Sequence, residues 1–141
     1  MSQGTFKKVE KSTKTLYGPR AMLVCGFSAA EQTDLMEFLE TINLRGLSVI
    51  FARGGDGEKL LKNLLALPDR TGWGEDSSLD RAIILSGITE KELHRTLSAY
   101  RGLELPRPLW ATLTLHSETW ILSSLLIELK KEREAMEKKT K

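Results

Sequence analysis

Two turns in this sequence have the residue types best suited to binding an anion. They are Gly26, Phe27 and Ser28, and Gly87, Ile88 and Thr89. A glycine followed by a hydroxyl residue at the start of a helix exposes backbone N–H groups at the positive end of the helix dipole, where a phosphate or carboxylate can bind. The same residues also build an ordinary capped turn between a strand and a helix. The turns are therefore candidate anion-binding elements, with helix capping as the alternative.

Catalytic chemistry has much less support from residue spacing. The single cysteine, Cys25, stands where a helix dipole could activate a thiol, but a small buried residue at a strand end explains it equally well. His94 and His116 have no nucleophile or carboxylate at a recognisable spacing, and residues 54–59 lack the spacing of a nucleotide phosphate loop. We predict no catalytic residue, no metal and no cofactor, and an enzyme that uses Cys25 is the least favoured alternative.

Charge is distributed unevenly along the 141 residues, whose net charge is +2. Residues 1–20 carry five basic and one acidic residue, and residues 130–141 carry six basic and three acidic residues, so the central part has an acidic surplus. Nucleic-acid binding is disfavoured, because it needs a basic surface on the folded core. No apolar run is long enough for a membrane span or a secretory signal, which predicts a cytoplasmic protein.

Short apolar runs alternate with segments of helical periodicity along the chain. Residues 21–25 and 47–52 have the composition of buried strands, and each is followed by apolar residues that recur with the period of a helix. Residues 82–86 and 109–114 repeat this pattern, and a last helix is expected from about Glu118. The order of elements predicts an α/β fold.

The two halves, residues 21–67 and 82–129, align at an offset of 61 residues. At this offset Ser28 aligns with Thr89 and Glu31 with Glu92, so both halves carry the spacing of a capping box, in which the cap hydroxyl and a glutamate three residues later bond each other's backbone. We therefore predict a duplicated β-α-β-α unit. Few aligned positions are identical, and chance similarity of common strand and cap patterns is the alternative.

A duplicated unit of this kind predicts where a site would lie. Right-handed crossovers pair the first strand with the second and the third with the fourth, which suggests a doubly wound, parallel four-stranded sheet in the order 2-1-3-4 with helices on both faces. Strands 1 and 3 would then end side by side, and the two glycine turns would line one crevice. Arg53 and His116, which follow strands 2 and 4, are expected on the same rim.

The domain organisation follows from composition. Residues 1–15 are polar and aperiodic and are predicted to form a mobile basic arm, and residues 16–129 form the single α/β domain. Pro68 is expected to end the second helix and to begin a long loop. Residues 130–141 continue the last helix as a projecting charged end, in which Met136 stays on the apolar stripe.

Several motifs resemble a family of bacterial proteins known only as a domain of unknown function. They are residues 16–20 (LYGPR), 25–28 (CGFS), 85–93 (LSGITEKEL) and 108–114 (PLWATLT). The resemblance covers residues 16–136 and implies a bacterial, cytoplasmic origin. It implies no activity, cofactor or site residue.

Three functions follow as hypotheses. The first is a non-catalytic binding or regulatory module that takes a small anionic ligand in the crevice between strands 1 and 3. The second is a protein-interaction or self-assembling domain that binds a partner, or a second copy, through a sheet edge or the C-terminal helix. The third is the enzyme that uses Cys25.

Overall fold

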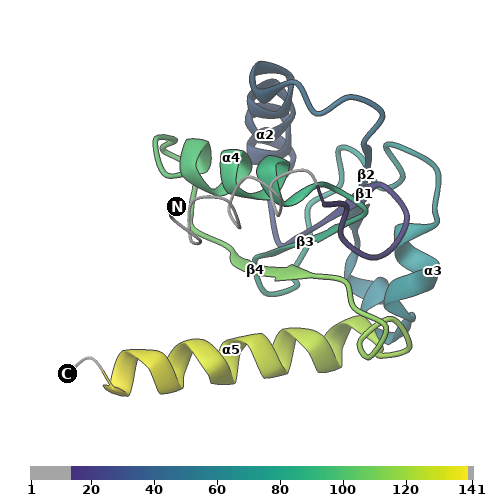
Figure 1. Ribbon diagram of the computed structural model, residues 1–141. Coiled ribbons are helices and arrows are strands. Elements are labelled where there is room, and N and C mark those ends of the chain that lie inside the picture. The colour runs from purple at the N-terminus through teal and green to yellow at the C-terminus, as the bar shows by residue number, and fades with distance from the viewer. Residues whose placement is uncertain (1–13, 140–141) are drawn as a thin grey trace.

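A four-stranded sheet in the order β2-β1-β3-β4 forms the centre of the computed structural model, in which residues 14–139 are described (Figure 1). The elements in chain order are β1 (Ala21–Cys25), α2 (Ala29–Ile42), β2 (Ser48–Ala52), the 3₁₀ turn η1 (Gly54–Glu58), α3 (Leu61–Leu65), β3 (Ala82–Ser86), α4 (Glu90–Tyr100), β4 (Leu109–Thr112) and α5 (Leu122–Lys139). The α/β class and the strand order agree with the prediction. Most of the predicted mobile arm, residues 1–13, lies outside the described residues.

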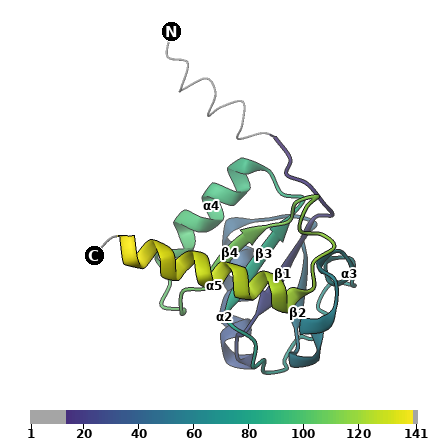
Figure 2. The ribbon, with the colours of Figure 1, turned by 90° about the horizontal axis from the view of Figure 1, so that it is seen from below.

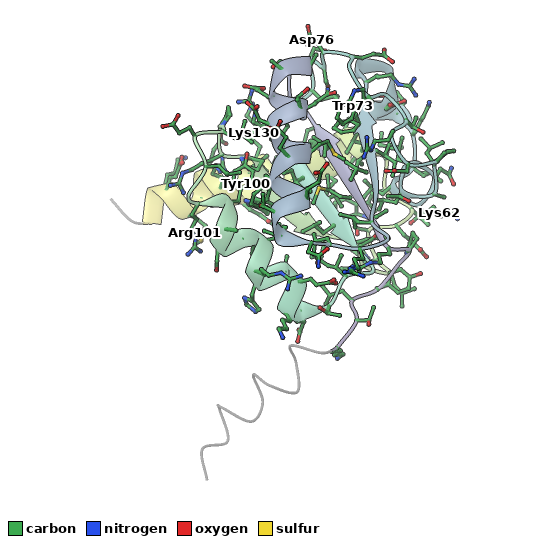
Figure 3. All side chains as sticks on the ribbon, turned by 90° about the horizontal axis from the view of Figure 1, so that it is seen from above. Lys62, Trp73, Asp76, Tyr100, Arg101 and Lys130 are labelled. Atoms are coloured by element: carbon green, nitrogen blue, oxygen red, sulfur yellow. The ribbon has the colours of Figure 1, made fainter. Side chains whose placement is uncertain are left out.

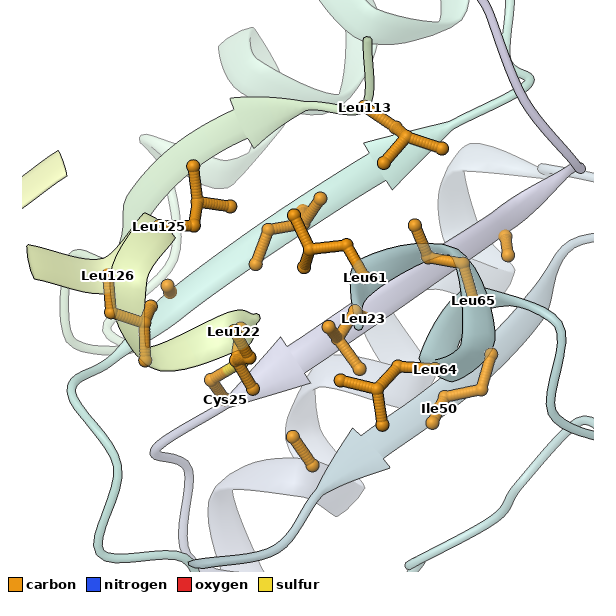
Figure 4. Close-up of a cluster of buried hydrophobic side chains, with 14 of the residues drawn as sticks. Leu23, Cys25, Ile50, Leu61, Leu64, Leu65, Leu113, Leu122, Leu125 and Leu126 are labelled. Atoms are coloured by element: carbon orange, nitrogen blue, oxygen red, sulfur yellow. The ribbon is translucent and has the colours of Figure 1, made fainter. Parts of the chain in front are cut away.

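The sheet is mixed, so the prediction of a purely parallel sheet is wrong. β1 pairs in parallel with β2, and β3 pairs in parallel with β4, as right-handed crossovers require. The central pair β1 and β3 is antiparallel, with Ala21 opposite Ser86 and Cys25 opposite Ala82. Figure 4 shows the arrows of β1 and β3 pointing in opposite directions.

The connection between the halves explains this reversal. After α3 the chain turns at Pro68 and runs beside β2 in the direction of that strand, where the N–H of Arg70 donates to the carbonyl of Val49 (2.8 Å) and the N–H of Phe51 donates to the carbonyl of Thr71 (2.8 Å). This returns the chain to the end of the sheet at which β1 and β2 finish. β3 therefore starts there and has to run back antiparallel to β1.

Helices cover both faces of the sheet, as predicted, and the two helices that follow the inner strands share one face (Figure 1). α2 and α4 cover the side chains of Met22, Val24, Ile83 and Leu85. On the other face, α3 and the first turns of α5 pack on Leu23, Cys25, Ile50 and Ile84 (Figure 4). Alternate residues of each strand thus point to opposite cores, which is why the strands are continuously apolar.

Contacts between the halves are related by the same offset of 61 residues that aligns the sequence. Leu23 lies opposite Ile84 at the centre of the β1–β3 pair. The N–H of Leu61 donates to the carbonyl of Trp120 (2.9 Å), and the N–H of Leu122 donates to the carbonyl of Lys59 (3.0 Å). Each half therefore contacts the other through residues that the offset aligns. The duplication of the unit itself stays a prediction.

The halves diverge where their second helices end. α3 and α5 begin at equivalent residues, Leu61 and Leu122, but Pro68 prevents the first helix from continuing, whereas Leu129 at the aligned position is helical. The chain after α3 therefore covers the outer edge of β2. α5 continues for several turns, crosses beneath the strands and extends past β4 (Figure 2).

Candidate functional site

The turn after β1 depends on a glycine that no other residue replaces easily. Gly26 has φ +76°, and a Cβ built on it would lie 2.5 Å from the carbonyl oxygen of Leu79. Phe27 is 1% exposed and packs beneath α2. Ser28 is the N-cap, whose hydroxyl accepts from the N–H of Glu31 (3.2 Å). The prediction of a capping box here is confirmed.

The protein's own carboxylates occupy the positions that an anion would take at this turn. The N–H of Ser28 donates to Glu31 (2.9 Å), and the N–H of Ala29 donates to the carboxylate of Asp76 (2.8 Å). Figure 3 places Asp76 at the end of α2, with Trp73 nearby. The turn is thus already neutralised from within, which favours capping over binding of an external anion.

The turn after β3 repeats this arrangement. Gly87 has φ +66° and packs against the backbone of residues 18–20, Ile88 is fully buried, and the hydroxyl of Thr89 accepts from the N–H of Glu92 (3.0 Å). The backbone N–H of the following residue, Glu90, donates to the carbonyl of Lys14 (3.0 Å). Here a main-chain carbonyl satisfies the helix terminus in place of a carboxylate.

The glutamate of each capping box is paired with the arginine that directly precedes the first strand of the other half. Arg20 binds Glu92 through two nitrogens, at 2.8 Å and 2.6 Å, and Arg81 binds Glu31 at 3.2 Å and lies over the ring of Phe27. The hydrogen bonds from Arg20 lower the pKa of Glu92 to about 2, against the opposing effect of burial. These equivalent ion pairs hold the two halves together.

The structure does not bring the predicted site residues into one crevice. Because β1 and β3 are antiparallel, Gly26, Phe27 and Ser28 lie at one end of the sheet with Arg53, and Gly87, Ile88 and Thr89 lie at the other end with His116. Arg53 donates to Asp56 (3.4 Å) and approaches Glu75 (3.8 Å). The ring of His116 packs edge-on against Trp120 (5.4 Å). The two turns therefore share no pocket, and binding of an anion at either turn alone stays a prediction.

The side chain of Cys25 lies among apolar side chains on the face of the sheet that α3 and α5 cover. It is 0% exposed, and Figure 4 shows it beside Leu122. Burial raises the pKa of its thiol, and the charge of Asp56 adds to this. A thiol in this position is neutral and inaccessible, which is the opposite of what a nucleophile needs.

A cavity that the sequence did not predict opens between α4 and β4. Its volume is about 330 Å³, and its walls combine aromatic and aliphatic side chains with three arginines. It is lined by Leu97, Tyr100, Arg101, Leu103, Leu105, Arg107, Pro108, Trp110 and Arg133. Figure 3 shows Tyr100 and Arg101 together at the end of α4.

Packing fixes the aromatic wall of this cavity. The ring of Tyr100 meets Trp110 edge-on at 5.2 Å, and its hydroxyl donates to the carbonyl of Pro106 (2.6 Å). Burial raises the pKa of Tyr100 to about 12, so the phenol stays neutral and does not offset the charge of the arginines. Arg133 reaches the same rim from α5 and donates to the carbonyl of Pro108 (3.0 Å).

The outer edge of β4 is unpaired among residues 14–139. The N–H of Leu109 donates to the carbonyl of Arg81 (3.0 Å), and the N–H of Leu113 donates to the carbonyl of Leu85 (2.9 Å). The backbone N–H and C=O groups of these alternate residues therefore point towards β3. The N–H and C=O groups of Trp110 and Thr112 must then point away from the sheet. No described residue bonds to them. They form a short open edge beside the cavity.

The described residues contain neither a helix long and apolar enough to cross a membrane nor a cluster of three or more His, Cys, Asp or Glu side chains that could hold a metal ion. Comparison with protein families then gives one match. Residues 81–136 match the family model of a domain of unknown function, DUF3783. This agrees with the resemblance to a domain of unknown function, over a shorter range than expected.

The DUF3783 segment comprises β3, α4, β4 and most of α5. It therefore contains the open edge and every residue that lines the cavity. The curated proteins gave no match to the chain, and neither did the solved structures.

Sequence reasoning missed the cavity because its arginines come from three separate segments. Arg101 follows α4, Arg107 precedes β4, and Arg133 lies within the charged end that we expected to project freely. One signal was present in the sequence. The stripe that includes Leu126 and Leu129 continues at helical spacing to Arg133 and Met136, beyond the residues that the core can cover.

Proposed function

We propose that this protein is an interaction module that binds an extended segment of another protein as a fifth strand beside β4. One observation carries the proposal, namely that the N–H and C=O groups of Trp110 and Thr112 point outward without partners in the described chain. Strand addition to such an edge is a common mode of peptide recognition, in which main-chain hydrogen bonds supply affinity and side-chain pockets supply specificity.

The contrast with the other edge supports this proposal. Proteins usually protect the outer strands of a sheet, because an open edge pairs with other chains. Here β2 is protected by the protein's own backbone, which bonds Val49 and Phe51. The aromatic contact of Trp73 with Phe51 (5.2 Å) and the stacking of Arg70 over Trp73 (5.0 Å) hold that cover in place. β4 has no such cover among residues 14–139.

The ends of the open edge also limit what can bind. Pro108 has no N–H, and its carbonyl already accepts from Arg133. At the other end, the N–H of Thr114 donates to the hydroxyl of Ser117 (3.1 Å). Only a short extended segment therefore pairs with β4, and affinity beyond its few main-chain bonds has to come from side chains.

Hydrogen exchange and a proline substitution test the proposal together. Peptides selected from a displayed random library against the full chain should protect the amides of Trp110 and Thr112 from exchange, whereas those of Leu109 and Leu113 are already protected by β3. Thr112→Pro removes one outward N–H and leaves the bonds to β3 intact, so it should abolish binding. Thr112→Ala is the matched control and should bind as the wild type does.

Two results would refute strand addition at β4. One is binding of the selected peptides to Thr112→Pro with undiminished affinity. The other is a complex in which the amides of Trp110 and Thr112 still exchange as fast as in the free protein. The unfolding midpoints of both variants in urea establish that each is folded.

A further inference from the structure

Building on the proposed strand addition, we infer that the bound segment is acidic and places a glutamate or aspartate side chain in the cavity between α4 and β4. The inference rests on three arginines around one pocket, on the absence of carboxylates facing them, and on the position of the pocket beside the open edge.

The arginines of the cavity have no acidic partners within the described chain. The ion pairs among residues 14–139 engage other basic residues, such as Arg20, Arg53 and Arg81. Arg101 and Arg107 are exposed and lie within 4 Å of no carboxylate among residues 14–139, and the bond described for Arg133 is to the carbonyl of Pro108. Planar guanidinium groups around a pocket suit a carboxylate, which accepts two parallel hydrogen bonds from them.

Strand geometry brings a side chain of an added segment to this pocket. Successive side chains of a strand alternate between the faces of the sheet, and neighbouring strands share this alternation. Trp110 points to the face covered by α4 and forms part of the cavity wall. A residue paired beside Trp110 therefore points to the same face, where the methylenes of a glutamate would pack on Trp110 and its carboxylate would meet Arg101 or Arg107.

A second copy of the chain fits this pocket less well than a different protein. Residues 105–114, which contain β4 and its approach, include no aspartate or glutamate, and their one charged residue is Arg107. A copy paired through its own β4 would bring no carboxylate from that strand to the arginines. Charge complementarity thus favours an acidic segment from a partner protein.

Three synthetic probes test the inference on the full chain. They are blocked heptapeptides of alternating valine and threonine with glutamate, glutamine or lysine at the position paired beside Trp110. Calorimetry should show the glutamate probe binding on the order of tenfold more tightly than the glutamine probe, since a hydrogen bond to a charged group contributes about 1.5 kcal/mol or more. The lysine probe should bind most weakly.

Variants assign the preference to the cavity. The double variant Arg101→Gln/Arg107→Gln should reduce the preference for glutamate over glutamine to less than about twofold. Arg95→Gln is the matched control, because Arg95 is an exposed arginine of α4 that does not line the cavity, and it should retain the full preference. Unchanged discrimination in the double variant would overturn the inference.

The outcomes separate this inference from the proposed function. Equal affinity for all three probes, with loss of binding in Thr112→Pro, overturns the acidic segment and keeps strand addition. Failure of the glutamate probe to bind at millimolar concentration counts against both. A dimer in light scattering that Thr112→Pro abolishes shows that a second copy occupies the edge, and it also overturns the acidic segment.

Discussion

The two halves of the molecule agree where they cap and cross-link each other and differ where their second helices end. In both, a glycine turn leads into a capped helix, and the arginine just before the first strand of one half binds the capping glutamate of the other. Beyond Leu65 the first half turns back along β2, whereas beyond Leu126 the second half continues as a helix past β4. The shared features stabilise the fold, and the edge of β4 that is unpaired among residues 14–139 lies in the region where the halves diverge.

The largest expected effect comes from breaking the cover of β2. Gly72 has φ +78°, and a Cβ built there would lie 2.0 Å from the carbonyl oxygen of Phe51. Gly72→Ala should therefore lower the free energy of unfolding by about 3 kcal/mol and uncover β2, making that edge resemble β4. Urea denaturation measures the loss, and faster exchange of the Phe51 amide reports the opened edge.

Gly74→Ala is the control for that experiment. Gly74 has φ +87°, but nothing lies within 4 Å of a Cβ built on it. It should cost only the backbone strain of about 1 kcal/mol. Equal losses at the two positions would mean that close contact with β2 does not determine the stability of the cover.

An intermediate effect should distinguish the two cross-half ion pairs. Glutamine keeps the capping hydrogen bonds and removes the charge. Glu92→Gln should cost about 2 kcal/mol, because Arg20 forms two short bonds to Glu92, and Glu31→Gln about 1 kcal/mol, because Arg81 forms a single longer bond. Urea titrations at neutral pH compare the two, and a larger loss for Glu31→Gln would contradict the geometric ranking.

The same pair gives a pH dependence of known sign. The pKa of Glu92 falls from 4.5 to about 2 on folding, so its contribution is fully present above about pH 4.5 and is lost as the pH falls towards 2. The stability difference between wild type and Glu92→Gln should therefore shrink over this interval. A constant difference from pH 5 to pH 2.5 would show that the charge of Glu92 is not responsible.

The last prediction needs no substitution and concerns the aligned strand ends, Cys25 and Ser86. Both side chains are buried, and Ser86 donates its hydroxyl to the carbonyl of Pro19. We expect a thiol reagent at neutral pH to label Cys25 at least about a hundredfold more slowly in the folded protein than in urea, because labelling requires opening of the core. Rapid labelling of Cys25 without denaturant would contradict this expectation and would support the hypothesis of an enzyme that uses Cys25.

Local patterns predicted the elements of this fold well, because local physics determines them. Ser28 with Glu31 and Thr89 with Glu92 specify helix starts, and apolar runs specify buried strands. The direction of β3 was not predictable in this way. It depends on where the chain after Pro68 lies. Contacts across the fold fix this position, such as the hydrogen bond from the N–H of Val49 to the carboxylate of Asp69 (2.7 Å).

The candidate site shows the same limit. The glycine turns could be recognised from sequence but not placed relative to each other, since that required the direction of β3. The cavity depends on Arg101, Arg107 and Arg133, whose proximity is a property of the folded chain. Met136, which is 63% exposed on the stripe of α5, was visible in sequence, but only the structure shows that the core ends before it.

The crossed pairs of Arg20 with Glu92 and Arg81 with Glu31 also bear on how the chain folds during synthesis. The ribosome releases β1, α2 and β2 well before Arg81 and β3 emerge. Until then the helix start at Ser28 lacks its arginine, and β1 has only one of its two neighbours in the sheet. The nascent first half should therefore stay incompletely ordered, and both halves should consolidate in a single late step.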